Sequence, residues 1–124
     1  MRLTQNFSLQ EFACKDGTSV PKEFYPNVKE LANNLQVLRD RIQAPIIISG
    51  SGYRTKSHNK KVGGAPKSQH LTASAADISV NNYSTLQLAS IIEELIAKGK
   101  MKQGGIGIYP TFVHYDIRGT KARW

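Results

Sequence analysis

The sequence is poor in cysteine, in acidic residues and in long apolar runs, and each shortage excludes a class of protein. Its 124 residues include one cysteine, Cys14, so an internal disulfide framework and a cysteine-rich zinc site are both excluded. The longest apolar run, Pro45 to Ile48, is far shorter than the ~20 residues of a membrane-spanning helix. We therefore expect no membrane insertion.

The shortage of acidic residues leaves a formal net charge of +8, from 17 Lys+Arg against 9 Asp+Glu. This charge favours an anionic partner such as nucleic acid, anionic lipid headgroups or an acidic cell-wall polymer. The basic residues are scattered and do not alternate with aromatic residues as in a stacking platform for nucleic acid. A solvated basic surface explains them equally well, and nucleic-acid binding is a hypothesis that rests on charge alone. Our prediction includes no nucleic-acid partner.

Apolar periodicity and capping patterns predict an α+β fold. The expected elements are a short helix from Ser8 over Phe12, a helix from Asn27 to Gln43, a strand over 46–49, a long loop over 50–69, a strand over 75–80, a helix from Ser84 towards Gly99, and a hairpin of strands 105–109 and 112–118. Helices come early and the hairpin comes late. We therefore expect one domain over residues 1–124, with a small, mostly antiparallel sheet and flanking helices.

A row of polar residues occupies the last predicted strand. Alternate residues of a strand share a face, so His114, Asp116 and Arg118 point to one side of the sheet. A solvent-exposed face explains this row, because half-exposed antiparallel sheets are common. A functional site explains it as well.

Asp77 lies in an apolar strand, and His70 precedes it by seven positions. A carboxylate buried there needs a partner: either the backbone, an imidazole from the preceding loop, or a metal shared with one. Together with His114, these residues make a candidate set of two imidazoles and one carboxylate. Three such ligands plus water form the open catalytic arrangement of Zn²⁺, whereas Ca²⁺ and Mg²⁺ require more oxygen ligands.

The order and spacing of several motifs add specificity. Ser51-Gly52-Tyr53-Arg54 precedes a glycine-rich loop, then Ser-x-His-x6-Asp over Ser68–Asp77, then His-x-Asp-x-Arg from His114. In this arrangement the chain resembles the zinc D-alanyl-D-alanine carboxypeptidase and peptidoglycan L,D-endopeptidase family, whose metal core is shared with hedgehog domains. It looks closest to the compact, single-domain branch found in phages and prophages.

The resemblance implies a fold of the hedgehog and D-Ala-D-Ala-peptidase type with one Zn²⁺ per chain, held by His70, Asp77 and His114. It also implies that Arg54 binds the substrate and stabilises the developing oxyanion. Ser68 matches a serine that lines the substrate site.

Two positions depart from the family pattern. Ala73 stands where the family usually has glycine, a mild change unless the backbone there needs a positive φ. Thr111 stands where many relatives place the acidic general base. The nearest carboxylate is Asp116, which we interpret either as the base or as a group that orients His114.

We therefore predict a monomeric zinc metallopeptidase of the endolysin type that hydrolyses peptidoglycan stem peptides. The sequence leaves open D-Ala-D-Ala carboxypeptidase or endopeptidase action. The alternative is a non-catalytic cell-wall-binding or virion structural module that keeps the zinc core. Residues 1–7 have no apolar signal region, so we expect synthesis in the cytoplasm and action on the wall after lysis or from a virion. We expect His58 at the surface and Cys14 as a small buried side chain.

Overall fold

Five short strands form one sheet in the computed structural model, which describes all 124 residues. The elements along the chain are the 3-10 helix η1 (Leu9–Phe12), η2 (Lys22–Phe24), α1 (Tyr25–Ile42), β1 (Ile47–Ile48), α2 (Lys56–Lys61), η3 (Gln69–Thr72), β2 (Ala75–Ser79), α3 (Thr85–Ala97), β3 (Gly105–Ile108), β4 (Val113–Asp116) and β5 (Ala122–Arg123). Helices and strands thus share the chain, and the predicted α+β class is confirmed.

The strand order of the sheet is β1-β2-β4-β3-β5. Every neighbouring pair is antiparallel except β3 and β5, which are parallel. In the central pair, β2 and β4, Asp77 lies directly opposite His114. Directly opposed residues on antiparallel strands have neighbouring side chains on the same face. The register of the sheet therefore brings these two residues of the candidate set together.

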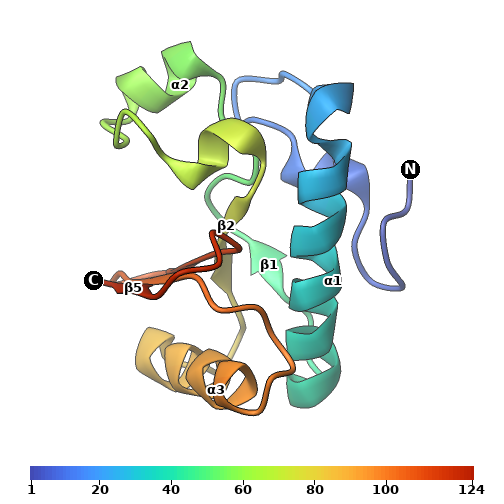
Figure 1. Cartoon of the computed structure of the whole chain (residues 1–124), viewed down its shortest axis with the longest axis vertical. Coiled ribbons are helices and arrows are strands. Elements are labelled where there is room, and N and C mark those ends of the chain that lie inside the picture. Colours follow the sequence, from blue (N-terminus) through green and yellow to red (C-terminus); the bar gives the residue numbers. More distant parts are fainter.

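The helices surround the sheet from several sides. In Figure 1, α1 runs along one side of the strands, α3 lies at one end of the molecule and α2 lies at the opposite end. The core contains 27 buried apolar side chains. It includes the stripe of α1 from Val28 to Ile42 and that of α3 from Leu88 to Leu95, which the helical periodicity indicates.

Besides β1 and β4, which are shorter than expected, three elements differ most from the sequence-based expectation. The expected loop over 50–69 contains α2, which has no apolar stripe because its sequence is Lys-Ser-His-Asn-Lys-Lys. Its first turn is held instead by Thr55, whose hydroxyl accepts a hydrogen bond from the His58 amide. Helix α1 starts at Tyr25, with Pro26 in its first turn, where proline suits a helix. Strand β5 has only two residues, too few for a periodic signal.

No helix of the structure has both the length and the apolar character needed to cross a membrane.

The capping box of α3 gives a test of the fold. The Ser84 hydroxyl accepts a hydrogen bond from the Gln87 amide (3.0 Å), and the Ser84 amide donates to the Gln87 side chain (2.8 Å). Ser84→Ala removes the first of these bonds, so we expect the free energy of unfolding to fall by about 1 kcal/mol. Ser90→Ala, at an exposed position inside the same helix, should leave stability unchanged or raise it. Urea denaturation of both variants checks this, and equal effects would contradict it.

Candidate metal centre

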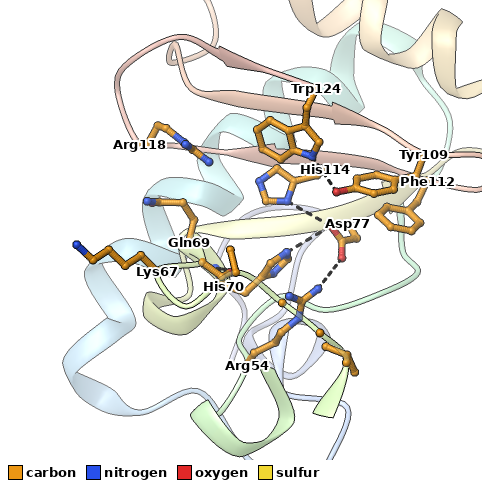
Figure 2. Close-up of a pocket in the computed structure, with 15 residues that line it drawn as sticks. Arg54, Lys67, Gln69, His70, Asp77, Tyr109, Phe112, His114, Arg118 and Trp124 are labelled. Atoms are coloured by element: carbon orange, nitrogen blue, oxygen red, sulfur yellow. Dashed lines mark hydrogen bonds and ion pairs between the residues drawn. The ribbon is translucent and has the colours of Figure 1, made fainter. Parts of the chain in front are cut away.

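Three buried side chains converge from three different elements: His70 from η3, Asp77 from β2 and His114 from β4. Their potential ligand atoms all lie within 4.8 Å of one another. Asp77 Oδ1 is 3.3 Å from His70 Nε2 and 3.5 Å from His114 Nδ1. Figure 2 shows both imidazoles pointing toward the Asp77 carboxylate. The structure therefore brings together the three residues that the sequence singled out.

The backbone sets the tautomer of His70. Its Nδ1 lies 2.8 Å from the carbonyl oxygen of Gly52, and a carbonyl oxygen can only accept a hydrogen bond. Nδ1 must therefore carry the proton. This leaves a lone pair on Nε2, which faces Asp77.

A second carboxylate sets the tautomer of His114. His114 Nε2 lies 2.7 Å from Oδ2 of Asp116, which is completely buried. Arg118 donates to both oxygens of Asp116, and the Gly105 amide donates to Oδ1 at 2.8 Å. Burial alone would raise the pKa of Asp116, but hydrogen bonds from His114, Arg118 and Gly105 outweigh it and lower that pKa well below its usual range. An ionised Asp116 accepts the Nε2 proton, so in the neutral form of His114 the lone pair lies on Nδ1, which faces Asp77.

Gly105 is required at its position by this arrangement. A Cβ there would collide with Oδ2 of Asp116. Glycine therefore lets β3 approach the carboxylate closely enough for its amide to donate to it.

The donor set fits a metal cation. Two imidazole lone pairs and a carboxylate oxygen face one point, and three acceptors without a positive charge between them repel one another. A carboxylate with two neutral imidazoles is a common ligand set for Zn²⁺ and leaves a coordination position open. Ca²⁺ and Mg²⁺ prefer oxygen ligands throughout.

The other oxygen of Asp77 belongs to a second network. Arg54 Nη2 lies 3.3 Å from Asp77 Oδ2, and Arg54 Nη1 donates to Asn59 Oδ1 at 3.2 Å. Asn59, in α2, also donates to the carbonyl oxygen of Ala65. Arg54 Nε is buried without a hydrogen-bond partner. Arg54 is thus held beside the candidate ligands with part of its donor capacity unused.

A cavity of about 510 Å³ opens over the three candidate ligands. One wall is aromatic: Tyr109 stacks on Phe112 with ring centres 4.5 Å apart, and Tyr109 accepts a hydrogen bond from the Trp124 indole at 2.8 Å. The Trp124 ring lies 4.9 Å from that of His114. The charged lining residues besides the candidate ligands are Arg54, Lys67 and Arg118. The cavity therefore combines an apolar wall with a cationic rim, as Figure 2 shows.

A family model described as Peptidase M15 matches residues 5–116, which span the helices, the strands β1 to β4 and the candidate metal centre. The chain belongs to the Peptidase M15 family. A comparison with curated proteins finds no match. Family membership confirms the resemblance to the D-alanyl-D-alanine carboxypeptidase group and makes the chain a member of a peptidase family.

The other site residues expected of this M15 chain lie in different surroundings. Arg54 and Ser68 both line the cavity, and the Ser68 hydroxyl accepts a hydrogen bond from the His70 amide. Asp116 does not line the cavity, because it lies behind the His114 ring. Thr111 is exposed and also lies outside the lining. Asp77 is the only carboxylate in the lining.

Several smaller expectations have clear outcomes. The row of polar residues in β4 is not a solvent-exposed face, because His114 and Asp116 are buried and Arg118 pairs with Asp116. Cys14 is buried, as expected. Ala73 has φ of +58°, a left-handed conformation that favours glycine, so the backbone there does need a positive φ.

Two supporting residues had no assigned role in the sequence analysis. Arg118 lies two residues beyond the end of β4, and its guanidinium still donates to both oxygens of Asp116. Asn59 lies in α2, within the expected loop, and nothing in the sequence connects it with Arg54.

The hydrogen bond from His114 to Asp116 gives a testable prediction. Asp116→Asn weakens the acceptor that fixes the His114 tautomer, and loss of such an outer hydrogen bond costs about 10–100-fold in metal affinity. We expect a loss of this size for Zn²⁺, measured by competition with a chromophoric chelator. Asp40→Asn, at an exposed position of α1, is the matched control. Equal affinity in both variants would contradict the assignment.

Proposed function

We propose that this chain is a zinc-dependent peptidase that hydrolyses peptide bonds of peptidoglycan stem peptides. The observation that carries the proposal is the convergence of His70 Nε2, His114 Nδ1 and Asp77 at the floor of a cavity, with the outer nitrogen of each imidazole already hydrogen-bonded. Zn²⁺ held there would polarise a substrate carbonyl and lower the pKa of its bound water towards ~7.

The lining of the cavity supports an anionic peptide as substrate. Arg54, Lys67 and Arg118 supply positive charge, and the only lining carboxylate is Asp77, which we assign to the metal. Stem peptides carry free carboxylates, which such a rim attracts. We assign Ser68 to the substrate-binding wall, because it lines the same cavity.

Arg54 is proposed to bind the substrate and to stabilise the developing oxyanion. Its guanidinium has five N–H donors, and its contacts with Asp77 and Asn59 engage only two of its nitrogens. The two contacts fix the orientation of the group before the substrate arrives. A preorganised donor of this kind stabilises transition-state charge without reorganisation.

Asp116 is proposed to orient His114 and not to act as the general base. Both of its oxygens are hydrogen-bonded, it is fully buried, and the His114 ring lies between it and Asp77. A base must reach the water proton directly or through one water. Arg118 supports the orienting role, because it holds Asp116 ionised and fixed in place.

One observation favours the alternative of a non-catalytic wall-binding module. Apart from the proposed ligand Asp77, no carboxylate lines the cavity, and Thr111 cannot accept a proton at neutral pH. A domain of this kind would keep the metal core and bind stem peptides without cutting them.

Digestion of purified murein by the zinc-loaded chain distinguishes the two functions. Mass spectrometry of the soluble products should show free D-alanine for a carboxypeptidase or shortened stem peptides with new amino termini for an endopeptidase. Chelation should abolish product release, and zinc should restore it. His114→Ala, which removes one proposed ligand, is the inactive control. If the wild-type chain sediments with murein but releases nothing, the binding module is correct and the peptidase proposal is wrong.

The same assay separates the two roles of Asp116. If Asp116 only orients His114, then Asp116→Asn regains most of its activity when zinc is raised to saturation. A general base would leave the variant inactive at every zinc concentration.

Arg54→Ala should lower turnover by about 10²–10³-fold, because a preorganised donor to the oxyanion is lost. Metal content, measured by atomic absorption, should stay at the wild-type level. Arg41→Ala is the matched control, since Arg41 pairs with Glu94 at the surface, 3.4 Å apart. Turnover of Arg54→Ala within a few-fold of the control would exclude the oxyanion role.

A further inference from the structure

A second group of metal-binding side chains lies outside the candidate metal centre. Cys14, Asp16 and His58 each offer a ligand atom, and these atoms lie within 4.8 Å of one another. Cys14 is buried, His58 is half-buried and Asp16 is exposed. None of the three lines the cavity over His70, Asp77 and His114. The proposed peptidase function leaves this group without a role.

The backbone around the group is already ordered. Cys14 and Asp16 belong to a tight turn in which the Cys14 amide donates to the Thr18 carbonyl at 2.9 Å. Gly17, with φ of +96°, allows the chain to reverse there. The Thr18 amide donates to Asp16 Oδ1 at 2.9 Å, which fixes the carboxylate within the turn. Two of the three candidate ligands are therefore held on one rigid segment.

Thr55 connects this turn to the third candidate ligand. Its hydroxyl donates to Asp16 Oδ2 at 2.8 Å and accepts from the amide of His58 at 3.2 Å. Hydrogen bonds from Thr18 and Thr55 lower the pKa of Asp16, which keeps its carboxyl ionised. Each carboxylate oxygen has two acceptor positions, so both can accept a hydrogen bond and one can still bind a cation.

We propose that Cys14, Asp16 and His58 form a second metal site that takes a borderline transition-metal cation, such as Zn²⁺ or Co²⁺, and ties the N-terminal turn to α2. A thiolate, an imidazole and a carboxylate are all ligands of such cations, and three protein ligands leave a fourth position for water. Calcium and magnesium would not accept the sulfur. The exposed Asp16 gives the cation a path from solvent.

Occupation of the site would stabilise the segment that supports Arg54. His58 is next to Asn59, and Asn59 holds both Arg54 Nη1 and the carbonyl of Ala65. A cation bound to the turn and to His58 therefore restrains α2 at the point where it contacts Arg54. Its role is structural, and it does not depend on the reaction at the first centre.

Spectroscopy of the cobalt-loaded full chain tests the proposal. Cys14 is the only cysteine, and the first centre has no sulfur ligand. A thiolate-to-cobalt charge-transfer band in the near ultraviolet therefore reports the second site alone. We expect the metal-free chain to bind two Co²⁺ and to develop this band. Cys14→Ser should lose the band and bind one Co²⁺, whereas His70→Ala should keep the band.

The other two ligands require variants that keep the thiol. His58→Gln and Asp16→Asn should each weaken the Co²⁺ affinity, read from the band, by at least about tenfold. Loss of a group that only orients a ligand already costs about tenfold in metal affinity, so loss of a ligand should cost no less. Asp40→Asn should not change it. These variants also cover the case in which Cys14→Ser fails to fold, because both alter side chains with access to solvent.

Absence of the band in the wild-type chain at saturating Co²⁺ would overturn the proposal. A band of unchanged affinity in His58→Gln and Asp16→Asn would also overturn it, because the thiol would then bind cobalt alone. Neither result depends on peptidase activity, so the proposed function would be unaffected.

Discussion

The candidate metal centre depends on one constraint: three buried hydrogen-bond acceptors face one another and repel. His70 Nε2, His114 Nδ1 and Asp77 Oδ1 face one another at 3.3 and 3.5 Å, away from solvent. Neither imidazole is expected to turn its protonated nitrogen towards Asp77, because Gly52 and Asp116 already hold that proton on the far side of each ring. A cation of suitable size removes the repulsion, and a buried anionic group requires such a partner.

The backbone of the sheet and of η3 brings these three acceptors together. The antiparallel register places Asp77 opposite His114, and η3 brings His70 to the same face. Gly105 lets β3 approach Asp116, which in turn holds His114. The side chains that hold the ligands are thus fixed by strands in the interior, whereas Arg54 depends on the short helix α2. Strands thus position two of the three proposed metal ligands, and the short helix α2 positions Arg54, the proposed substrate-binding group.

The sequence predicted those features that leave a periodic or local signal. The stripe of α1, the capping box at Ser84 and the hairpin of β3 and β4 all have such signals, and each was found in the structure. Alternation along the expected strand over 112–118 also predicted that His114, Asp116 and Arg118 share a face; β4 ends at Asp116, and Arg118 reaches that carboxylate from beyond the strand. The sequence could not distinguish the two possible roles of Asp116. A general base would face the cavity, whereas an orienting group lies on the other side of the His114 ring. That depends on the packing of β3, on Gly105 and on the Arg118 guanidinium. Helix α2 was missed for a similar reason, since a cap and the contacts of Asn59 hold it without an apolar stripe.

Anomalous diffraction at the zinc edge from crystals of the zinc-loaded chain tests the central claim most directly. Among these three side chains the account predicts a strong peak at about 2.0–2.1 Å from His70 Nε2 and His114 Nδ1 and at about 2.0–2.2 Å from a carboxylate oxygen of Asp77, whether or not a second peak lies beside Cys14. It also predicts that Nε2 of His114 stays hydrogen-bonded to Asp116. A peak bound to Nε2 of His114, or no peak among these three side chains, would contradict the account.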